Sequence, residues 1–288
     1  MSLTLTPLHS HFAAEASGID LTQPLDPQQV GEIDAAMNRY AVLVWRRQPM
    51  TQQQQMQLAS SFGTLDIGLK RVFKRKERLE YEELIDISNV GPDGQVVKRD
   101  APKNLSNFAN MLWHSDSSFQ NPRAAYSMLS AVVLPSWGGN TEFTDLRAAY
   151  DALPERIKEE IKDLETEHSA LHTRLLLGDN AYTDEQKKEI PPAAWPLVTT
   201  HPGSGRKVLF VGVHATHIIG WPVAEGRMYL HDLLEHATQR QFVYAHEWEA
   251  GDLVMWDNRS TLHRGRRYDI GERRELRRTT VNDETGTH

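Results

Sequence analysis

Residues 252–280, DLVMWDNRSTLHRGRRYDIGERRELRRTT, hold two short segments of strand-forming residues on either side of a turn-rich stretch that carries a histidine. We expect the two segments, 252–256 and 274–280, to form a last pair of strands. Earlier segments of the same character, 126–134, 140–145 and 207–213, are bounded by glycine turns. Together they predict a mainly β fold with helical insertions (α+β), built on a double-stranded β-helix or jelly-roll barrel.

Helical insertions are expected at residues 26–40, after Thr51, after Pro154 and over 223–238. The first begins with Asp26-Pro27, a capping residue followed by proline in the first turn. In the second, glutamines 52–55 are expected to face solvent. Because no linker or internal repeat divides the segments, we expect one domain over residues 1–288.

The composition limits the kinds of site and partner. The 288 residues include no cysteine, which excludes thiolate zinc sites, iron–sulfur clusters, disulfides and cysteine nucleophiles. With 39 acidic and 32 basic residues, the formal charge of −7 argues against nucleic-acid or membrane partners. The first residues do not resemble a secretory signal, and no apolar run is long enough to span a membrane. We therefore expect a cytoplasmic protein.

Three side chains have the chemistry of a metal site. His114 and Asp116 are two positions apart, so on an extended segment they share one face. On its own, such a pair more often consists of ordinary polar residues on the protein surface. His263 lies far away in sequence, but a barrel can bring distant strands together. Two histidines and one carboxylate on one side of an octahedral ion leave three positions open, as in the facial triad of non-heme Fe(II) oxygenases.

Two arginines extend this hypothesis. On a strand, Arg274 and Arg278 share a face, so both guanidinium groups can point into the cavity that holds the metal. Arginine binds carboxylates through a bidentate fork. A metal beside two arginines points to two acidic organic ligands, a cosubstrate and a substrate. The alternative is a solvated basic edge, because charged residues of both signs surround the pair.

The sequence resembles the Fe(II)/2-oxoglutarate-dependent dioxygenases of the taurine dioxygenase superfamily, most of all the branch that oxidises 2,4-dichlorophenoxyacetate. The resemblance extends over nearly the whole chain. It rests on the stretches PLHSHFAA, DISNV, NFANMLWHSDSSF, YSMLSAVV, GGNTEFTDLRAAYDALP, HPGSGRK, LLEHATQ, GDLVMWDNRSTLHRGRRYD and RRELRRTT.

The resemblance implies a cofactor, a cosubstrate and their binding residues. His114, Asp116 and His263 would bind Fe(II). Arg274 and the Thr141 hydroxyl would hold the distal carboxylate of 2-oxoglutarate, with O2 as the second cosubstrate. It also implies a jelly-roll fold and hints at a homo-oligomer.

For the substrate, the resemblance implies a small carboxylate held by Arg278. An aryloxyacetate such as 2,4-dichlorophenoxyacetate would be hydroxylated at the carbon between the ether oxygen and the carboxylate, giving a phenol, glyoxylate, succinate and CO2. Ser117 is a further candidate for a substrate hydrogen bond. Arg71 is a candidate second anion contact, in a segment, 66–80, that aligns poorly with the family.

Two alternatives stay open. The same chemistry could act on another small anion, such as a sulfonate, an alkyl sulfate or a natural aryl acid. From a different class, the chain could be a metal- and ligand-binding barrel without turnover, or a zinc hydrolase. Arg274, at its spacing from His263, argues against both members of that class.

Overall fold

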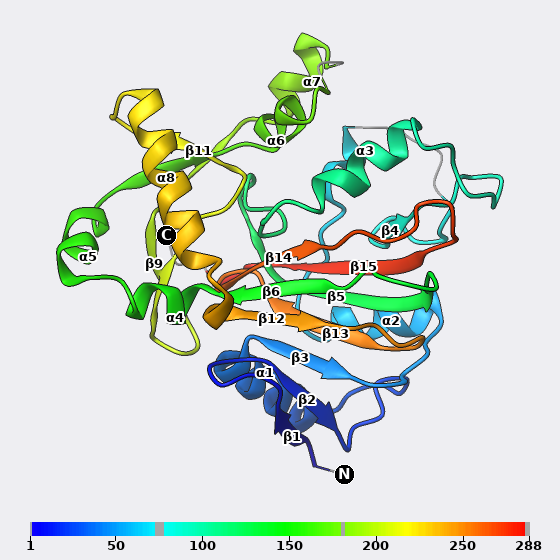
Figure 1. Ribbon diagram of the computed structural model, residues 1–288. Helices are drawn as coiled ribbons and strands as arrows, with labels where there is room; N and C mark the ends of the chain where they lie inside the picture. The colour runs from blue at the N-terminus through cyan, green and yellow to red at the C-terminus, as the bar shows by residue number, and fades with distance from the viewer. Residues whose placement is uncertain (1, 73–77, 180–181, 286–288) are drawn as a thin grey trace.

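A seven-stranded sheet runs through the centre of the protein in the computed structural model, which describes residues 2–72, 78–179 and 182–285 (Figure 1). Its strands, in spatial order, are β1 (Thr4–Pro7), β2 (Ala14–Ser17), β3 (Val42–Trp45), β13 (Leu253–Asp257), β5 (Ala124–Val133), β15 (Glu275–Asn282) and β4 (Ile85–Ser88). Neighbouring strands are antiparallel except the parallel pair β2 and β3. The long strand β5 therefore lies between β13 and β15.

A three-stranded sheet packs against one face of this large sheet. Its strands are, in order, β12 (Val243–His246), β6 (Thr141–Asp145) and β14 (Thr261–Gly265). Phe143 from β6 packs with Leu129, Trp256 and Leu276 from the large sheet in one buried cluster. Burial of such large apolar side chains contributes roughly 1.5–3 kcal/mol each, so this layer holds the two sheets together.

Two helices cover the opposite face of the large sheet, α1 (Pro27–Tyr40) and α2 (Gln52–Ser60). Asp26 caps α1 as expected, since its side chain accepts from the Gln29 amide within a capping box. The expectation that residues 52–55 face solvent is wrong for Gln55. Its side chain is fully buried, and Nε2 donates to the carbonyl of Arg277 at 2.9 Å. A glutamine here satisfies a strand carbonyl that the covering helix shields from water.

The remaining elements form a second lobe beside the two sheets (Figure 1). Its strands are β7 (Glu165–His168), β8 (Ala193–Pro196), β9 (Val198–Thr200), β10 (Lys207–Leu209) and β11 (Ala215–Ile218). Its helices are α4 (Leu146–Asp151), α5 (Glu155–Ile161), α6 (Ala170–Leu176), α7 (Asp184–Glu189) and α8 (Val223–Ala237). The helix α3 (Pro102–Ala109) and the short 3₁₀ helices Gly68–Arg71 and Arg240–Phe242 complete the fold. Apolar residues of α4, α8, β10 and β11 share one buried cluster.

The predicted mixture of strands and helical insertions is confirmed, with two differences. The strands at 252–256 and 274–280 are not partners, because β5 pairs with both of them. Strand β14, which carries His263, was not among the strands predicted from the sequence. Over the described ranges the large and small sheets face each other without closing into one hydrogen-bonded barrel. None of the helices seen in those ranges is both long and apolar enough to cross a membrane.

Candidate active site

His114 and His263 lie far apart in the sequence and are held side by side by their own backbones. The amide of His114 donates to the carbonyl of His263 at 3.0 Å, and the amide of His263 donates back at 2.8 Å. This isolated antiparallel bridge brings the two imidazole centroids within 4.1 Å of each other. A backbone bridge places both side chains on the same face of the strand pair, and here that face is the pocket.

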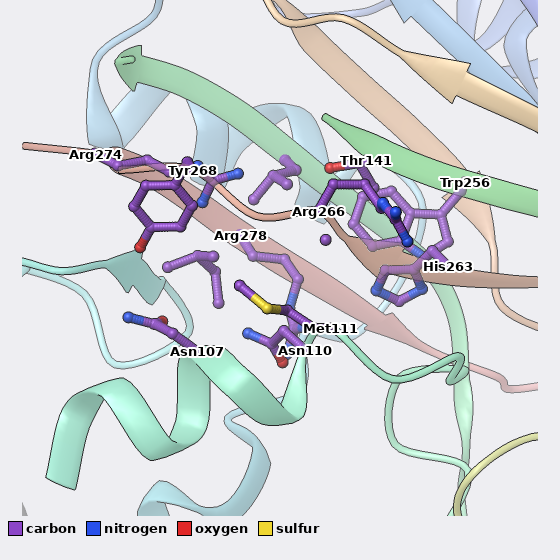
Figure 2. A pocket seen from close by; sticks show the side chains of 13 residues that line it. Asn107, Asn110, Met111, Thr141, Trp256, His263, Arg266, Tyr268, Arg274 and Arg278 are labelled. Atoms are coloured by element: carbon purple, nitrogen blue, oxygen red, sulfur yellow. The ribbon is translucent and has the colours of Figure 1, made fainter. Parts of the chain in front are cut away.

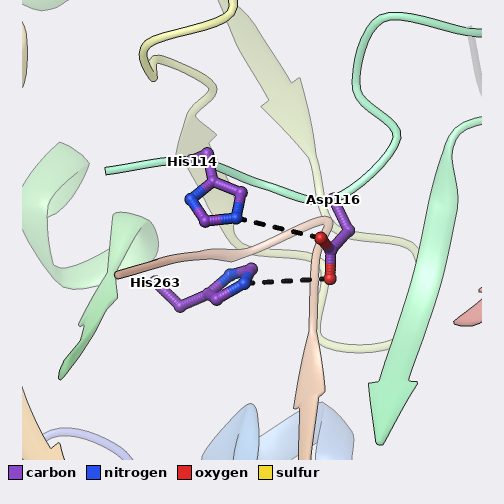
Figure 3. Close-up of side chains that lie close together, drawn as sticks. All are labelled: His114, Asp116 and His263. Carbon is purple, nitrogen blue, oxygen red and sulfur yellow. Dashed lines mark ion pairs between the residues drawn. The ribbon is translucent and has the colours of Figure 1, made fainter. Parts of the chain in front are cut away.

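Asp116 completes a cluster of three possible metal ligands (Figure 3). Its Oδ1 is 3.9 Å from Nε2 of His114, and its Oδ2 is 3.8 Å from Nε2 of His263. One ligand atom from each side chain lies within 4.8 Å of the others, and all three residues are buried. The structure thus brings together the three residues that the sequence singled out.

The protonation of this cluster suits a metal ion. Burial is the main cause that lowers the pKa of His114 and of His263, so both imidazoles are neutral near pH 7. Burial alone would raise the pKa of Asp116, but the Arg278 charge and the two histidines outweigh it and lower that pKa to about 2. Two neutral imidazoles and one ionised carboxylate are the donor set that Fe(II) takes in facial-triad sites.

His114 also has a fixed tautomer. Its Nδ1 lies 2.7 Å from the carbonyl oxygen of Leu112, which can only accept, so Nδ1 carries the proton. The lone pair is therefore on Nε2, the atom that faces Asp116. Contacts of this type orient metal-binding histidines and raise their basicity.

A pocket opens beside His263 (Figure 2). The residues that line it come from α3 and the segment after it, from β4, β5, β6, β13, β14 and β15, and from the loop that precedes β15. They are Ile87, Asn107, Asn110, Met111, Leu129, Thr141, Trp256, His263, Gly265, Arg266, Tyr268, Arg274 and Arg278. Both predicted arginines therefore share one cavity with a predicted metal ligand.

Arg274 is a buried cation at the end of this pocket. It is 7% exposed, and burial lowers its pKa to about 10. Its guanidinium stacks on the ring of Tyr268 at 5.0 Å and donates to the Gly139 carbonyl at 3.1 Å. In the parts of the chain that the structure describes, no carboxylate pairs with it and its Nε has no acceptor. An unpaired buried cation is costly, so the site fits an anionic ligand.

The backbone before β6 is shaped to admit Arg274. Gly139 has a φ of +76°, and a Cβ there would lie 3.1 Å from Nε of Arg274. At the preceding residue, Gly138, with a φ of +73°, a Cβ would approach the Arg267 carbonyl oxygen to 2.2 Å. Glycine is favoured at both positions because the backbone is left-handed, and at Gly138 a side chain would also collide with a backbone oxygen.

Thr141 lies at the start of β6 and faces the same pocket. Its Oγ1 accepts a hydrogen bond of 3.0 Å from Nε1 of Trp248. An indole N–H can only donate, so the hydroxyl proton of Thr141 stays available for another acceptor. Sequence reasoning did not single out Trp248, because nothing in its local pattern indicates a contact with a residue more than 100 positions earlier.

Arg278 contacts a metal-ligand candidate directly. Its Nη1 donates to Oδ1 of Asp116 in an ion pair, while its Nε has no hydrogen-bond partner among the described residues. Arg278 therefore lies between the triad and the pocket, with part of its donor capacity unused. That position is compatible with binding a second anion.

Of the two other candidates from the sequence, Ser117 is not brought into the pocket. The Ser117 hydroxyl donates to Oδ2 of Asp66 at 2.7 Å, and Ser117 is absent from the pocket lining. Its φ of +51° places it in a tight turn rather than on a strand. Arg71 ends the 3₁₀ helix Gly68–Arg71, and its side chain lies outside the described part of the structure.

Comparisons with known proteins agree with this geometry. The family model "Taurine catabolism dioxygenase TauD, TfdA family" matches residues 4–280. An alpha-ketoglutarate-dependent 2,4-dichlorophenoxyacetate dioxygenase of Cupriavidus pinatubonensis is 58% identical over 99% of both chains. An (S)-phenoxypropionate/alpha-ketoglutarate-dioxygenase of Sphingobium herbicidovorans is 36% identical over 94% of this chain and 91% of its own. The crystal structure of AAD-2 with Mn(II) and N-oxalylglycine superposes with a TM-score of 0.95 and 46% identity over the full length of both chains.

Proposed function

Because the chain belongs to the taurine catabolism dioxygenase TauD, TfdA family, we propose that it hydroxylates an aryloxyacetate such as 2,4-dichlorophenoxyacetate. The hydroxylated carbon is the one between the ether oxygen and the carboxylate, and the products are a phenol, glyoxylate, succinate and CO2. Enzymes of this family are oxidoreductases that use Fe(II), 2-oxoglutarate and O2. The substrate class follows the 58% identical relative.

One observation carries the proposal. A single pocket contains a neutral histidine of the His-Asp-His cluster and two guanidinium groups, one of them buried without a carboxylate partner among the described residues. A zinc hydrolase does not need two guanidinium groups that bind two separate anions beside its metal. Oxidation with 2-oxoglutarate needs a place for a cosubstrate dicarboxylate and a place for the substrate.

The metal would be held by Nε2 of His114, Nε2 of His263 and the carboxylate of Asp116. This assignment rests on the donor set, its burial and the 4.8 Å limit on the distances between the ligand atoms. When bound, Fe(II) supplies the activation of O2, driven by oxidation of 2-oxoglutarate to succinate and CO2. The facial arrangement leaves three positions open for ligands other than protein.

The cosubstrate would be recognised at the far end of the pocket by Arg274 and Thr141. Arg274 offers the charge and a planar fork of donors, which matches a carboxylate in a bidentate contact. Thr141 adds one hydroxyl proton, because Trp248 already occupies a lone pair of that oxygen.

The substrate carboxylate would be recognised by Arg278, next to Asp116. Its free donors can bind the carboxylate while the apolar lining, which includes Met111 and Leu129, accommodates an aryl ring. Holding the carboxylate fixes the neighbouring carbon close to the metal, and such orientation is worth several kcal/mol in rate. Ser117 and Arg71 stay as weaker substrate candidates.

We extend the proposal to the architecture and setting of the enzyme. The two facing sheets, held together by the buried cluster around Phe143, would be the halves of a double-stranded β-helix within a single domain, 1–288. An assembly of several copies would cover the exposed side chains of Leu175 and Met228. A cytoplasmic location remains the expectation from the sequence. Light scattering and cell fractionation test the last two points.

The substitution Arg278→Leu tests the substrate assignment. It should raise the KM for 2,4-dichlorophenoxyacetate strongly, by at least about 30-fold, because a buried charged hydrogen bond to the carboxylate is lost. Mn(II) binding should persist. Succinate release, measured with a panel of aryloxyacetates, sulfonates and alkyl sulfates, separates this substrate class from the alternative anions. An unchanged KM for the aryloxyacetate would refute the role of Arg278.

A further inference from the structure

Asn258 is a buried residue between β13 and β14 that contacts the metal-ligand segment through backbone and side chain together. Its side-chain Oδ1 accepts from the amide of Asp116 at 3.1 Å. Its backbone carbonyl accepts from the hydroxyl of Ser115 at 2.8 Å, and its own amide donates to Ala125 at 2.8 Å. Asn258 thus ties the 115–116 segment to strand β5.

The orientation of the Asn258 amide is determined by its neighbours. The Asp116 amide and Nε1 of Trp256, which is 3.0 Å away, both point at the same side-chain atom of Asn258. Both groups can only donate, so that atom must be the carbonyl oxygen. The other side-chain atom is then the amide nitrogen, which donates to Oγ of Ser127 at 2.9 Å.

This orientation in turn directs the proton of Ser127. The Ser127 hydroxyl has a single proton, and its oxygen already accepts a hydrogen bond from the amide nitrogen of Asn258. Oδ2 of Asp116 lies 2.8 Å away and accepts from this hydroxyl. The proton of Ser127 therefore points to Asp116, and the third neighbour, Oγ1 of Thr280 at 3.2 Å, is the donor in its contact with Ser127.

The loop that carries Asn258 is rigidly held on both sides. Asp257 forms a buried ion pair with Arg259, 2.7 Å from Nη2, and a hydrogen bond of 2.8 Å with Nε2 of His201. All of these groups are almost fully buried. Asn258 is therefore a fixed reference point for the side chains that depend on it.

We propose that Asn258 and Ser127 are positioning residues for the metal ligand Asp116. Asn258 fixes the backbone of Asp116 and orients Ser127, and Ser127 fixes the carboxylate between the two imidazoles, 3.9 Å from one and 3.8 Å from the other. The carboxylate is thus prepared for the metal before the metal arrives. This inference rests on the proposed function, since it assigns Asp116 to the metal.

The test compares Mn(II) affinity among variants by following the electron paramagnetic resonance signal of free Mn(II), without cosubstrate or substrate. Ser127→Ala removes the hydrogen bond to Asp116. Asn258→Asp keeps the shape but offers Ser127 a second carboxylate, which draws its proton away from Asp116. We expect each variant to bind Mn(II) about 10- to 100-fold more weakly, as found when groups that orient metal ligands are removed.

The double variant sharpens the test. If both residues act through the single hydrogen bond from Ser127 to Asp116, the loss in Ser127→Ala/Asn258→Asp is smaller than the product of the two separate losses. Two independent structural defects would multiply instead. Ser130→Ala is the matched control, because Ser130 is equally buried on β5 but, three positions along the strand, faces the opposite side. Its Mn(II) affinity should equal that of the unmodified protein.

The variant His114→Ala distinguishes a failure of the positioning inference from a failure of the metal-site assignment. Loss of Mn(II) binding in His114→Ala, together with unchanged binding in Ser127→Ala and Asn258→Asp, would overturn the positioning inference and leave the metal site standing. Unchanged binding in His114→Ala would instead overturn the metal site itself. If Asn258→Asp does not fold by circular dichroism, the result for Ser127→Ala decides the inference.

Discussion

Arg274 is the residue whose surroundings say most about the function. A guanidinium that is 7% exposed, stacked on Tyr268 and joined to a single carbonyl leaves most of its donors unused within the described structure. Native proteins rarely bury a charge in this way without a partner. Under the proposed function the missing partner would be a cosubstrate carboxylate, and the unpaired charge would lower the stability of the ligand-free protein while favouring binding.

Replacing Arg274 by methionine separates these two effects. Methionine has a similar length and no charge to desolvate, so the ligand-free protein should keep its melting temperature or gain a few degrees. Affinity for 2-oxoglutarate should fall at least about 30-fold, the lower bound for losing one partner of a buried charged pair. Calorimetry on the ligand-free protein and titration with N-oxalylglycine measure the two quantities. A large drop in melting temperature would show that Arg274 is structural.

Trp248→Phe tests the part played by the Thr141 hydroxyl. Without the indole donor the hydroxyl can rotate, so its proton is no longer directed into the pocket. We expect the KM for 2-oxoglutarate to rise roughly five-fold, equivalent to about 1 kcal/mol for one neutral hydrogen bond. The KM for the aryloxyacetate should not change. Equal increases in both KM values would point to a general disturbance of the pocket.

The sequence allowed prediction of the charged residues and of the candidate metal ligands. It did not allow prediction of the residues that orient these side chains through hydrogen bonds. His114, Asp116 and His263 were predicted as a cluster because the motifs that carry them resemble those of the dioxygenase family, whereas the spacing of His114 and Asp116 alone was a weak signal. Trp248 and Asn258 could not be predicted, because their partners lie more than 100 positions away and their own neighbourhoods look like ordinary strand ends. For Gln55 the error was similar, since a polar residue was taken as a mark of solvent.

At the scale of elements, the site depends on β14 and on the segment that holds His114. The capped helix α1 was predictable because Asp26 and Pro27 mark its start and apolar spacing marks its face. Strand β14 was not, because TLHRG has no alternation of apolar and polar residues. Its strand character comes from pairing with β6, a tertiary contact that overrides weak local preference.

In the second lobe, His168 at the end of β7 makes the folding stability of the protein depend on pH. Burial, with the nearby Arg123 cation, lowers the pKa of His168 to about 3, and the ring stacks on Phe210 with centroids 5.1 Å apart. The native state keeps this histidine neutral while the unfolded chain protonates it near its usual value of about 6.5. The native state therefore loses stability as pH falls from about 6.5 towards 3.

His168→Gln should reduce that loss. Between pH 7 and pH 5 the free energy of unfolding of the variant should fall by about 2 kcal/mol less than that of the unmodified protein, because one depressed histidine contributes up to ~1.4 kcal/mol per pH unit below its unfolded pKa. Urea denaturation at the two pH values measures the difference. The exposed His231→Gln is the control and should leave the pH dependence unchanged. An identical pH dependence in His168→Gln would contradict the prediction.

At the scale of the whole molecule, the pocket lies where the two facing sheets and helix α3 meet, and each wall supplies one chemical function (Figure 2). The proposed metal ligands lie at and beside the bridge between His114 and β14. The proposed cosubstrate contacts come from β6 and the residue preceding β15, and the proposed substrate contact lies further along β15. Motif spacing suggested a metal site, and the family resemblance implied the dioxygenase chemistry. The order of the strands in the sheet, with β5 between β13 and β15, could not be predicted from the sequence and is known from the structure.

An anaerobic visible-absorption titration of the Fe(II)-loaded protein, first with 2-oxoglutarate and then with 2,4-dichlorophenoxyacetate, decides whether the protein is the proposed dioxygenase. We predict a weak metal-to-ligand charge-transfer band on the first addition and a shift of that band on the second. The band reports binding of the cosubstrate to iron, and the shift reports an aryloxyacetate next to it. A band that never shifts would contradict the substrate class, and no band in folded, iron-loaded protein would contradict the dioxygenase itself.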